Sequence, residues 1–421
     1  MNQSSDDARA AFAGRAGLGA TVAETIDALA TIGRGDDGGV TRVAWSPELF
    51  AAYQWMGDAM RALGLEVAID AAGNLVGRWN TGTGAPVVLG SHLDTVPSGG
   101  AYDGAFGVVA AAHAVRTLQE EGIRPERPVW IVAFMDEEGT RFGSALFGSR
   151  AFVGDDVTSF GDRTDARGVS LRDAMREAGF DFERVAEAAA VERIAAYLEL
   201  HIEQGPVLEA EGLDIGVVTT VVGLRGYRVR LRGQANHAGT TPMALRRDAL
   251  AGAARIALEL RGFARARDGL TANVGRISVE PGGANVVPGV ADFTIDVRAA
   301  TDDGIAELER AVEEIVTRVA SEERLEAELE PTFALAPVAL DPGLVETVQR
   351  AAAAEGASFK RMPSGAGHDA MLLARHVPSA IIFVPSRDGV SHAPEEYTSP
   401  HHVERGMRVL AASLRQILEE K

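Results

Sequence analysis

The chain has 421 residues, of which 46% are hydrophobic and 24% charged, values typical of a globular protein with two or three domains. Its 41 Lys and Arg against 60 Asp and Glu give a formal net charge of −19, and such a surface repels nucleic acid and anionic lipid. The absence of Cys excludes disulfides and thiolate ligands, so any bound metal must be held by His, Asp and Glu.

The N-terminal segment 1–14 reads MNQSSDDARAAFAG and has no apolar core, so it does not resemble a secretory signal. No run of 18 apolar residues occurs. We therefore expect a cytoplasmic protein with no membrane and no nucleic-acid partner. Because the acidic surface also repels small anions, a substrate with a carboxylate would require a local arginine.

The first half of the chain alternates apolar runs with helical patterns, which predicts an α/β fold with a parallel or mixed sheet. A helix is predicted after Gly104, ending at Gly122. Strands are predicted at 85–90, 127–134, 197–202 and, near the C-terminus, 380–384.

The segment 216–331 has a different pattern. Tyr227, Val229 and Leu231 alternate with arginines, which is typical of a strand with one solvated face. After it we predict a helix at 246–265, strands at 273–279 and 291–297, a helix at 303–326, and a last strand near 325–329 or beyond. This order matches a split β-α-β unit. We therefore predict an inserted domain at 216–331 between two parts of one catalytic domain, 1–215 and 332–421.

Candidate metal ligands lie at the ends of the predicted strands or in the turns that follow them: His92, Asp103, Glu138, His201 and His392. Ligands bind at this edge of open α/β sheets, so we expect these side chains to gather there. Asp94 is two residues from His92, where its carboxylate can accept the second N–H of the imidazole and orient it. Three His and two carboxylates favour zinc-like ions over calcium or magnesium.

A single His or one Asp-Glu-Glu-Gly turn is more often structural or solvated than a ligand. Four of the nine His are interpreted as structural: His113, His376, His401 and His402. The other five lie in motifs flanked by Gly, Pro or carboxylates. One of these motifs, SGAGHDA at 364–370, is interpreted as a pocket loop, and its His368 is assigned no role.

Seven motifs together resemble the hydantoinase/carbamoylase subfamily of di-zinc amidohydrolases, part of the aminoacylase and carboxypeptidase clan. They are GSHLDTVPSGGAYDG, DEEGTRFGSALFGSR, LHIEQGPVLE, GQANHAGTTPM, GGANVVPG, SGAGHDA and SHAPEE, and the resemblance extends from Gly38 to the end of the chain. It implies a di-zinc exopeptidase-like catalytic domain with a mixed central sheet, and an inserted ferredoxin-like α+β domain that acts as a lid and in dimerisation.

The resemblance also implies the roles of the catalytic residues. Asp103 would bridge two divalent ions, with His92 and His201 completing one site and Glu138 and His392 the other. Glu137 would be the general base, and Asp94 would orient His92. The ions are expected to be zinc, with manganese, cobalt or nickel as alternatives.

For the substrate, the resemblance implies Gln204, together with His237, Asn285 and Arg298 from the inserted domain. Arg298 would bind a carboxylate with its planar fork, and His237 would help to stabilise the oxyanion. In related enzymes such residues reach the site of a partner subunit, so a homodimer is expected.

The expected reaction is hydrolysis of an N-carbamoyl-L-amino acid to the L-amino acid, carbon dioxide and ammonia. An allantoate amidohydrolase is the first alternative, and a peptidase or aminoacylase of the clan the second. A catalytically inactive binding protein on the same fold would require a missing ligand or base, and the sequence retains all of them.

Overall fold

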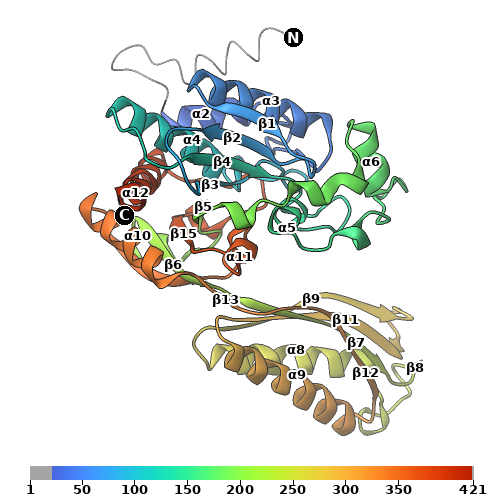
Figure 1. Ribbon diagram of the computed structural model, residues 1–421. Coiled ribbons are helices and arrows are strands. Elements are labelled where there is room, and N and C mark those ends of the chain that lie inside the picture. Colours follow the sequence, from blue (N-terminus) through green and yellow to red (C-terminus); the bar gives the residue numbers. More distant parts are fainter. Residues whose placement is uncertain (1–20, 420–421) are drawn as a thin grey trace. The chain divides into compact units, whose positions relative to one another are not determined.

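The computed structural model describes residues 21–419, which divide into two compact units (Figure 1). The first unit is formed by the chain up to Thr219 and from Ala339 onward, and the second by Thr220–Val338. The second unit ends later than the predicted insertion because its last strand continues to Leu335. Segment 1–14, on which the expectation of no secretory signal depends, lies outside the described residues. Between residues 21 and 419, no helix is long and apolar enough to cross a membrane.

The first unit is built on a nine-stranded mixed sheet in the order β1-β2-β4-β3-β5-β15-β6-β13, with β14 paired to β6. The central strands β3, β4, β5 and β15 are parallel and almost entirely buried, which explains their continuous apolar sequences. The strands are β1 (Glu66–Ile69), β2 (Leu75–Trp79), β3 (Val87–His92), β4 (Val129–Phe134), β5 (Ala196–Ile202), β6 (Ile215–Val221), β13 (Val338–Ala339), β14 (Phe359–Ser364) and β15 (Ser379–Val384).

Helices cover both faces of this sheet. Side chains alternate between the faces of a strand: Leu200 of β5 packs against Gly406 of α12, whereas the neighbouring Glu199 accepts a hydrogen bond from Ala370 N at the start of α11. The helices of this unit are α2 (Val22–Leu29), α3 (Pro47–Ala62), α4 (Ala105–Glu120), α5 (Phe147–Val153), α6 (Leu171–Glu177), α7 (Val207–Glu211), α10 (Pro342–Ala354), α11 (Ala370–Leu373) and α12 (Pro400–Glu419).

Local sequence explains where several helices begin. Ser46 caps α3 by accepting a hydrogen bond from Leu49 N, and Pro47 occupies the first helical position, where its missing N–H costs nothing. Asp341 and Pro342 start α10 in the same way.

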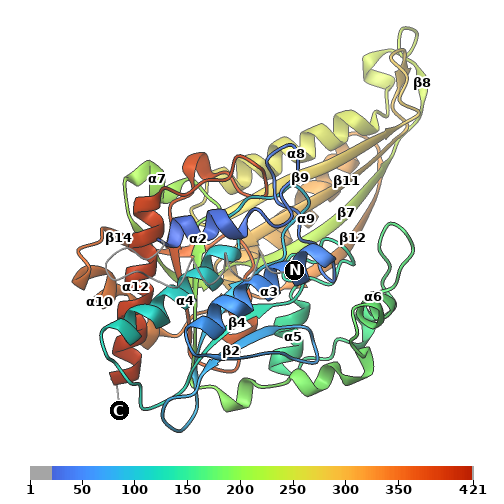
Figure 2. The same ribbon diagram turned by 90° about the horizontal axis from the view of Figure 1, so that it is seen from above.

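The second unit is a four-stranded antiparallel sheet in the order β12-β7-β11-β9 with two helices on one face. Its chain order is β-α-β-β-α-β, as the sequence pattern predicts. Its main elements are β7 (Gly223–Arg232), α8 (Ala249–Arg265), β9 (Leu270–Glu280), β11 (Val290–Ala299), α9 (Asp302–Glu322) and β12 (Glu326–Leu335). A short ribbon of β8 (Asn236–His237) and β10 (Val286–Val287) lies at one end of this sheet (Figure 2).

The core of the second unit lies between the sheet and the two helices. On β11, Ala291, Phe293 and Val297 face this core, whereas Asp296 and Arg298 belong to the opposite, open face of the sheet. The open face is therefore polar, and it carries the arginines of the alternating pattern in β7.

Candidate metal centre

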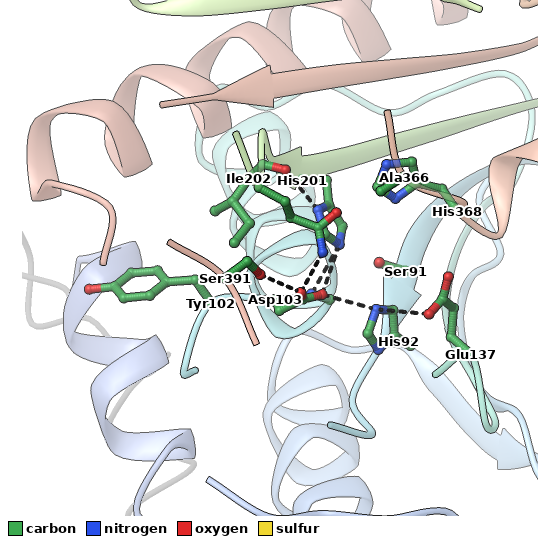
Figure 3. A network of polar contacts seen from close by, with 12 residues as sticks. Ser91, His92, Tyr102, Asp103, Glu137, His201, Ile202, Ala366, His368 and Ser391 are labelled. Carbon is green, nitrogen blue, oxygen red and sulfur yellow. Dashed lines mark hydrogen bonds and ion pairs between the residues drawn. The ribbon is translucent and has the colours of Figure 1, made fainter. Parts of the chain in front are cut away.

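Four neighbouring parallel strands bring the predicted ligands together. In the sheet, β4, β3, β5 and β15 are consecutive neighbours, so their carboxyl ends share one edge. The five candidate ligands lie on or just after these strands, or in the turn that opens α4: His92, Asp103, Glu138, His201 and His392. Figure 3 shows His92, His201 and Ser391 arranged around Asp103.

A first group of ligand atoms surrounds one oxygen of Asp103. Its Oδ1 lies 3.4 Å from His92 Nε2 and 3.2 Å from His201 Nε2. The other ring nitrogens, Nδ1, each lie 2.9 Å from a main-chain oxygen, of Asp94 and Ile202 respectively. A carbonyl can only accept a hydrogen bond, so Nδ1 carries a proton in both rings. Both Nε2 atoms face Asp103 Oδ1, and that of His201 also accepts a hydrogen bond from Gly104 N at 3.2 Å.

A second group surrounds the other oxygen of the same carboxylate. His392 Nε2 lies 3.2 Å from Asp103 Oδ2 and 3.5 Å from Glu138 Oε1. The amide of Gln204 donates to Asp103 Oδ2 at 2.6 Å and lies 3.4 Å from His392 Nε2. Gln204 therefore contacts two atoms of the second group, Asp103 Oδ2 and His392 Nε2. Asp103 belongs to both groups, with Oδ1 in the first and Oδ2 in the second.

The donor set fits divalent metal ions. Imidazole and carboxylate atoms 3.2 to 3.5 Å apart have the spacing of ligands around one ion with bonds of about 2.0–2.1 Å. The hydrogen bond with Asp103 raises the pKa of His392 to about 9, and burial raises the pKa of Glu138 to about 7. The shift of His392 reflects the negative charge of Asp103 beside it, and such charge favours a cation.

Asp94 acts through different atoms from those expected. The sequence interpretation has its carboxylate orient His92, but its Oδ1 is 3.8 Å from His92 Nδ1, and the main-chain oxygen is the near partner. The carboxylate instead accepts hydrogen bonds from the main-chain N–H groups of Glu137 and Glu138, at 3.3 and 3.2 Å. Asp94 thus holds the turn after β4 against the end of β3.

Glu137 lies beside the first group, with its Oε2 3.8 Å from His92 Nε2 (Figure 3). Burial raises the pKa of its carboxyl well above the usual range, although the neighbouring His92 opposes this shift. Its position leaves the carboxylate available to accept a proton near the ligand atoms.

Glu396 is a residue that the sequence interpretation did not single out. Its Oε1 accepts hydrogen bonds from the N–H groups of Tyr102 and Asp103, at 2.9 and 3.0 Å, and its Oε2 accepts from Ser391 Oγ at 2.8 Å. The Ser391 hydroxyl also lies 2.9 Å from Asp103 Oδ2. Glu396 therefore ties the turn that carries Asp103 to the loop that carries His392. Its position as the last residue of the SHAPEE motif could have identified Glu396 from the sequence.

His368, to which the sequence assigns no role, packs against the candidate ligand His201. Its ring is edge-on to that of His201, with centroids 4.6 Å apart, and its Nε2 lies 3.0 Å from Ser364 Oγ. Burial lowers its pKa well below the usual value, so the ring is neutral. His368 thus supports the orientation of His201.

The backbone is unusual at several of these positions. Gln204 and His392 are not glycines, yet both have left-handed φ angles, 56° and 58°. Such conformations cost free energy and concentrate at functional sites. Gly104 has φ 62°, and a Cβ atom there would lie 2.4 Å from the His92 ring, so the turn next to Asp103 requires glycine.

Two of the three predicted substrate residues of the second unit, His237 and Asn285, are neighbours, whereas Arg298 lies apart from them. His237 of β8 pairs with Val286, next to Asn285, whose main-chain oxygen accepts a hydrogen bond from Ala238 N at 2.8 Å. Strand β11 begins at Val290, a few residues after this pair, and Arg298 lies eight residues further along it. At ~3.3 Å per strand residue, Val290 and Arg298 are separated by about 26 Å.

The hydrogen bonds of His237 and Arg298 indicate which interaction each side chain could make with a substrate. His237 Nδ1 accepts hydrogen bonds from Gly239 N and Thr240 N, at 3.0 and 3.2 Å, so its proton is on Nε2, which can donate. The fork of Arg298 pairs with Asp296, with Nε–Oδ1 at 2.8 Å and Nη2–Oδ2 at 3.2 Å.

Comparisons with known proteins agree with this arrangement. Residues 88–416 match peptidase family M20/M25/M40. An N-carbamoyl-L-amino-acid amidohydrolase of Paenarthrobacter aurescens is 41% identical over 88% of this chain and 92% of its own. An allantoate amidohydrolase of Bacillus subtilis (strain 168) is 40% identical over 93% and 95%. The crystal structure of a hydantoinase/carbamoylase family amidase from Burkholderia multivorans superposes with a TM-score of 0.89 at 37% identity, covering 95% of this chain and 98% of that one.

Proposed function

Since this chain belongs to peptidase family M20/M25/M40, we propose that it is a metal-dependent amidohydrolase that cleaves N-carbamoyl-L-amino acids to the L-amino acid, carbon dioxide and ammonia. The observation that carries the proposal is the pair of ligand groups that share Asp103, with Glu137 beside them. Relatives named as N-carbamoyl-L-amino acid amidohydrolases, at 35 to 41% identity, support this substrate class.

Two divalent ions per chain are part of the proposal. One would be held by His92, His201 and Asp103, and the other by Asp103, Glu138 and His392. Zinc suits this N/O donor set, and manganese, cobalt and nickel are alternatives. Such ions supply a water molecule of lowered pKa and polarise the carbonyl of the substrate.

Glu137 is assigned the proton transfers. Its carboxylate would take the proton of the attacking water and pass it to the leaving nitrogen. Support comes from its position 3.8 Å from His92 Nε2 and from its place directly before Glu138 in the chain. Asp94 would keep both glutamates in place through their main-chain N–H groups.

Substrate contacts are assigned to Gln204, His237, Asn285 and Arg298. Arg298 would bind the substrate carboxylate, because a guanidinium matches two carboxylate oxygens, as its pairing with Asp296 illustrates. His237 would donate through Nε2 to the oxygen that becomes negative during the reaction.

A homodimer through the second unit is also proposed. One small substrate cannot contact Arg298 and His237 of the same subunit if most of the length of β11, about 26 Å from Val290 to Arg298, lies between them, so one of them would serve a partner's site. β9 is an edge strand of the sheet, and Leu258 of the adjacent α8 and Ile277 of β9 are 67% and 47% exposed. An open edge beside exposed apolar side chains suits pairing with a second copy.

The deciding experiment measures ammonia release from a panel of N-carbamoyl-L-amino acids, allantoate and 3-ureidopropionate. We expect the highest kcat/KM with an N-carbamoyl-L-amino acid. A higher kcat/KM with allantoate would assign the chain to the second candidate, which the Bacillus subtilis relative represents. No ammonia from any of them by metal-loaded protein would contradict the proposal.

A further inference from the structure

A second group of possible metal ligands lies outside the candidate centre. It consists of Asp214, which precedes β6, and of His401 and His402 in the first turn of α12. One ligand atom from each residue lies within 4.8 Å of the other two. Asp214 Oδ1 is 3.2 Å from His401 Nε2 and 3.9 Å from His402 Nε2. Ligand atoms around a tetrahedral ion with bonds of 2.0–2.1 Å are about 3.3 Å apart, so small adjustments would suffice.

Hydrogen bonds from Ser358 fix the carboxylate of Asp214 through its Oδ2 atom. Its Oδ2 accepts hydrogen bonds from the N–H and the hydroxyl of Ser358, both at 2.9 Å. The main-chain N–H of Asp214 donates to the same hydroxyl at 3.0 Å. With Oδ2 engaged in this way, Oδ1 is the oxygen presented to both imidazoles. Partners of this kind orient the ligands of metal sites in proteins.

His402 has a comparable partner. Its Nδ1 lies 3.0 Å from Ser399 Oγ, which can accept the Nδ1 proton and leave the Nε2 lone pair directed at Asp214. The rings of His401 and His402 pack edge-on, with centroids 5.2 Å apart. His401 is 61% exposed and Asp214 18%, so an ion would reach the group from solvent and could keep water as a further ligand.

We propose that Asp214, His401 and His402 form a third site for a zinc-like divalent ion, separate from the centre around Asp103. Two imidazoles and one carboxylate select zinc, copper or nickel over magnesium and calcium. An ion there would connect the N-terminal turn of α12 to the segment that leads into β6. The competing explanation is an ion pair between Asp214 and a protonated His401, in which His402 is not involved.

Zinc binding by the full-length protein distinguishes a metal site at Asp214, His401 and His402 from an ion pair between Asp214 and His401. Wild type, His401→Gln and His402→Gln are equilibrated against a series of zinc buffers, and bound zinc per chain is counted by atomic emission. The matched control is His376→Gln, an exposed histidine outside the cluster. We expect wild type and control to bind one ion per chain more than either cluster variant, while all four keep the same ammonia-releasing activity.

Thermal unfolding gives a second readout that does not depend on activity. A ligand that binds only the folded state raises Tm as its concentration increases. Once the tighter ions are bound, further zinc should raise the Tm of wild type and of His376→Gln, but not that of the two cluster variants. Magnesium should have no such effect on any of them. Equal zinc counts and equal zinc-dependent Tm shifts in all four proteins would overturn the proposal, as would loss of the extra ion in His401→Gln but not in His402→Gln.

Discussion

Adjacent residues in this site have different surroundings, and Glu137 and Glu138 show it most clearly. Glu138 Oε1 lies 3.5 Å from His392 Nε2 and belongs to the second ligand group. Glu137 Oε2 lies beside His92 of the first group. Both main-chain N–H groups donate to the carboxylate of Asp94, so the turn is fixed while the two side chains diverge. A substitution of one glutamate should therefore leave the other in position.

Glu137→Gln tests the proton-transfer role. Glutamine keeps the shape of the side chain but cannot accept the proton of water, so kcat should fall by about 10²–10⁴. Steady-state ammonia release measures the loss, and metal analysis should show an unchanged ion content. The control is Glu395→Gln, an exposed glutamate, which should retain wild-type kcat. A decrease of less than tenfold would mean that another group acts as the base.

Glu396 permits a test of positioning. Glu396→Ala removes the acceptor for the N–H groups of Tyr102 and Asp103, so metal affinity should fall by about 10- to 100-fold. Glu396→Gln keeps an acceptor oxygen and should recover most of it. Ion retention during titration with a chelator measures the affinity, with Glu395→Gln as the control. If the alanine variant retained its ions as well as wild type, the link between the two loops would not matter for metal binding.

Among the elements, the strands that carry the site could be predicted and the contacts between them could not. Buried parallel strands are continuous apolar runs, so predictions at 127–134 and 380–384 fall close to β4 (Val129–Phe134) and β15 (Ser379–Val384). Ligands at their carboxyl ends follow from the same rule. Glu396, however, binds the main chain of Asp103 from 293 positions away, and no spacing in the sequence indicates such a pair. The sequence also could not show that Asp94 uses its main-chain oxygen toward His92, since this depends on the local turn.

Packing of α2 against α4 predicts a pH dependence of stability. His113 of α4 lies 2.9 Å from Thr25 Oγ1, and burial, with Arg116 adding to it, lowers its pKa to about 3. The unfolded chain takes up the proton near pH 6.5, well above the folded pKa, so the free energy of unfolding falls as pH decreases below that value. The slope is at most ~1.4 kcal/mol per pH unit.

Urea unfolding at pH 7.5 and pH 5 measures this contribution. Wild type should lose about 2 kcal/mol more than His113→Gln between these pH values, because glutamine stays neutral. His376→Gln, an exposed control, should behave as wild type. Equal losses in wild type and His113→Gln would show that folding does not lower the pKa of His113.

Strand β11 sets the environment of Arg298. Asp296 and Arg298 are two residues apart on the open face of the sheet, and their side chains pair through two hydrogen bonds. Arg298→Lys keeps the charge but loses the fork, so kcat/KM should decrease about ten- to hundred-fold, the value of a charged hydrogen bond of ~1.5–3 kcal/mol. Arg276→Lys, on the neighbouring strand β9, is the control. An unchanged kcat/KM for Arg298→Lys would remove Arg298 from the substrate contacts.

For the whole molecule, the two compact units divide the proposed tasks. The candidate metal ligands and Glu137 belong to the first unit, and His237, Asn285 and Arg298 to the second. Such a division, together with the length of β11, would make the proposed dimer necessary for activity. The net charge of −19 repels a substrate that carries a carboxylate. Because added salt screens this repulsion, it should increase the rate at which the substrate reaches Arg298.

Mixing two inactive variants tests the proposed dimer. If His237 serves a partner's site, His237→Ala and Glu137→Gln chains should form heterodimers with one intact site. Ammonia release should then recover to at most about half of the wild-type value in each heterodimer, since symmetric dimers use both sites alike. Chains with different tags, co-purified after exchange, show that heterodimers have formed. Heterodimers without recovered activity would mean that each subunit builds its own site.

Asp103 links the two ligand groups, because Oδ1 belongs to one and Oδ2 to the other. The groups are therefore thermodynamically coupled. An ion in the first would orient the carboxylate for the second and reduce the entropy lost on binding there, while repulsion between the two proposed cations would act in the opposite direction. Loading of the ion-free protein should then follow a binding curve whose Hill coefficient differs from one. Replacing Asp103 should abolish both binding steps together, rather than remove one and leave the other.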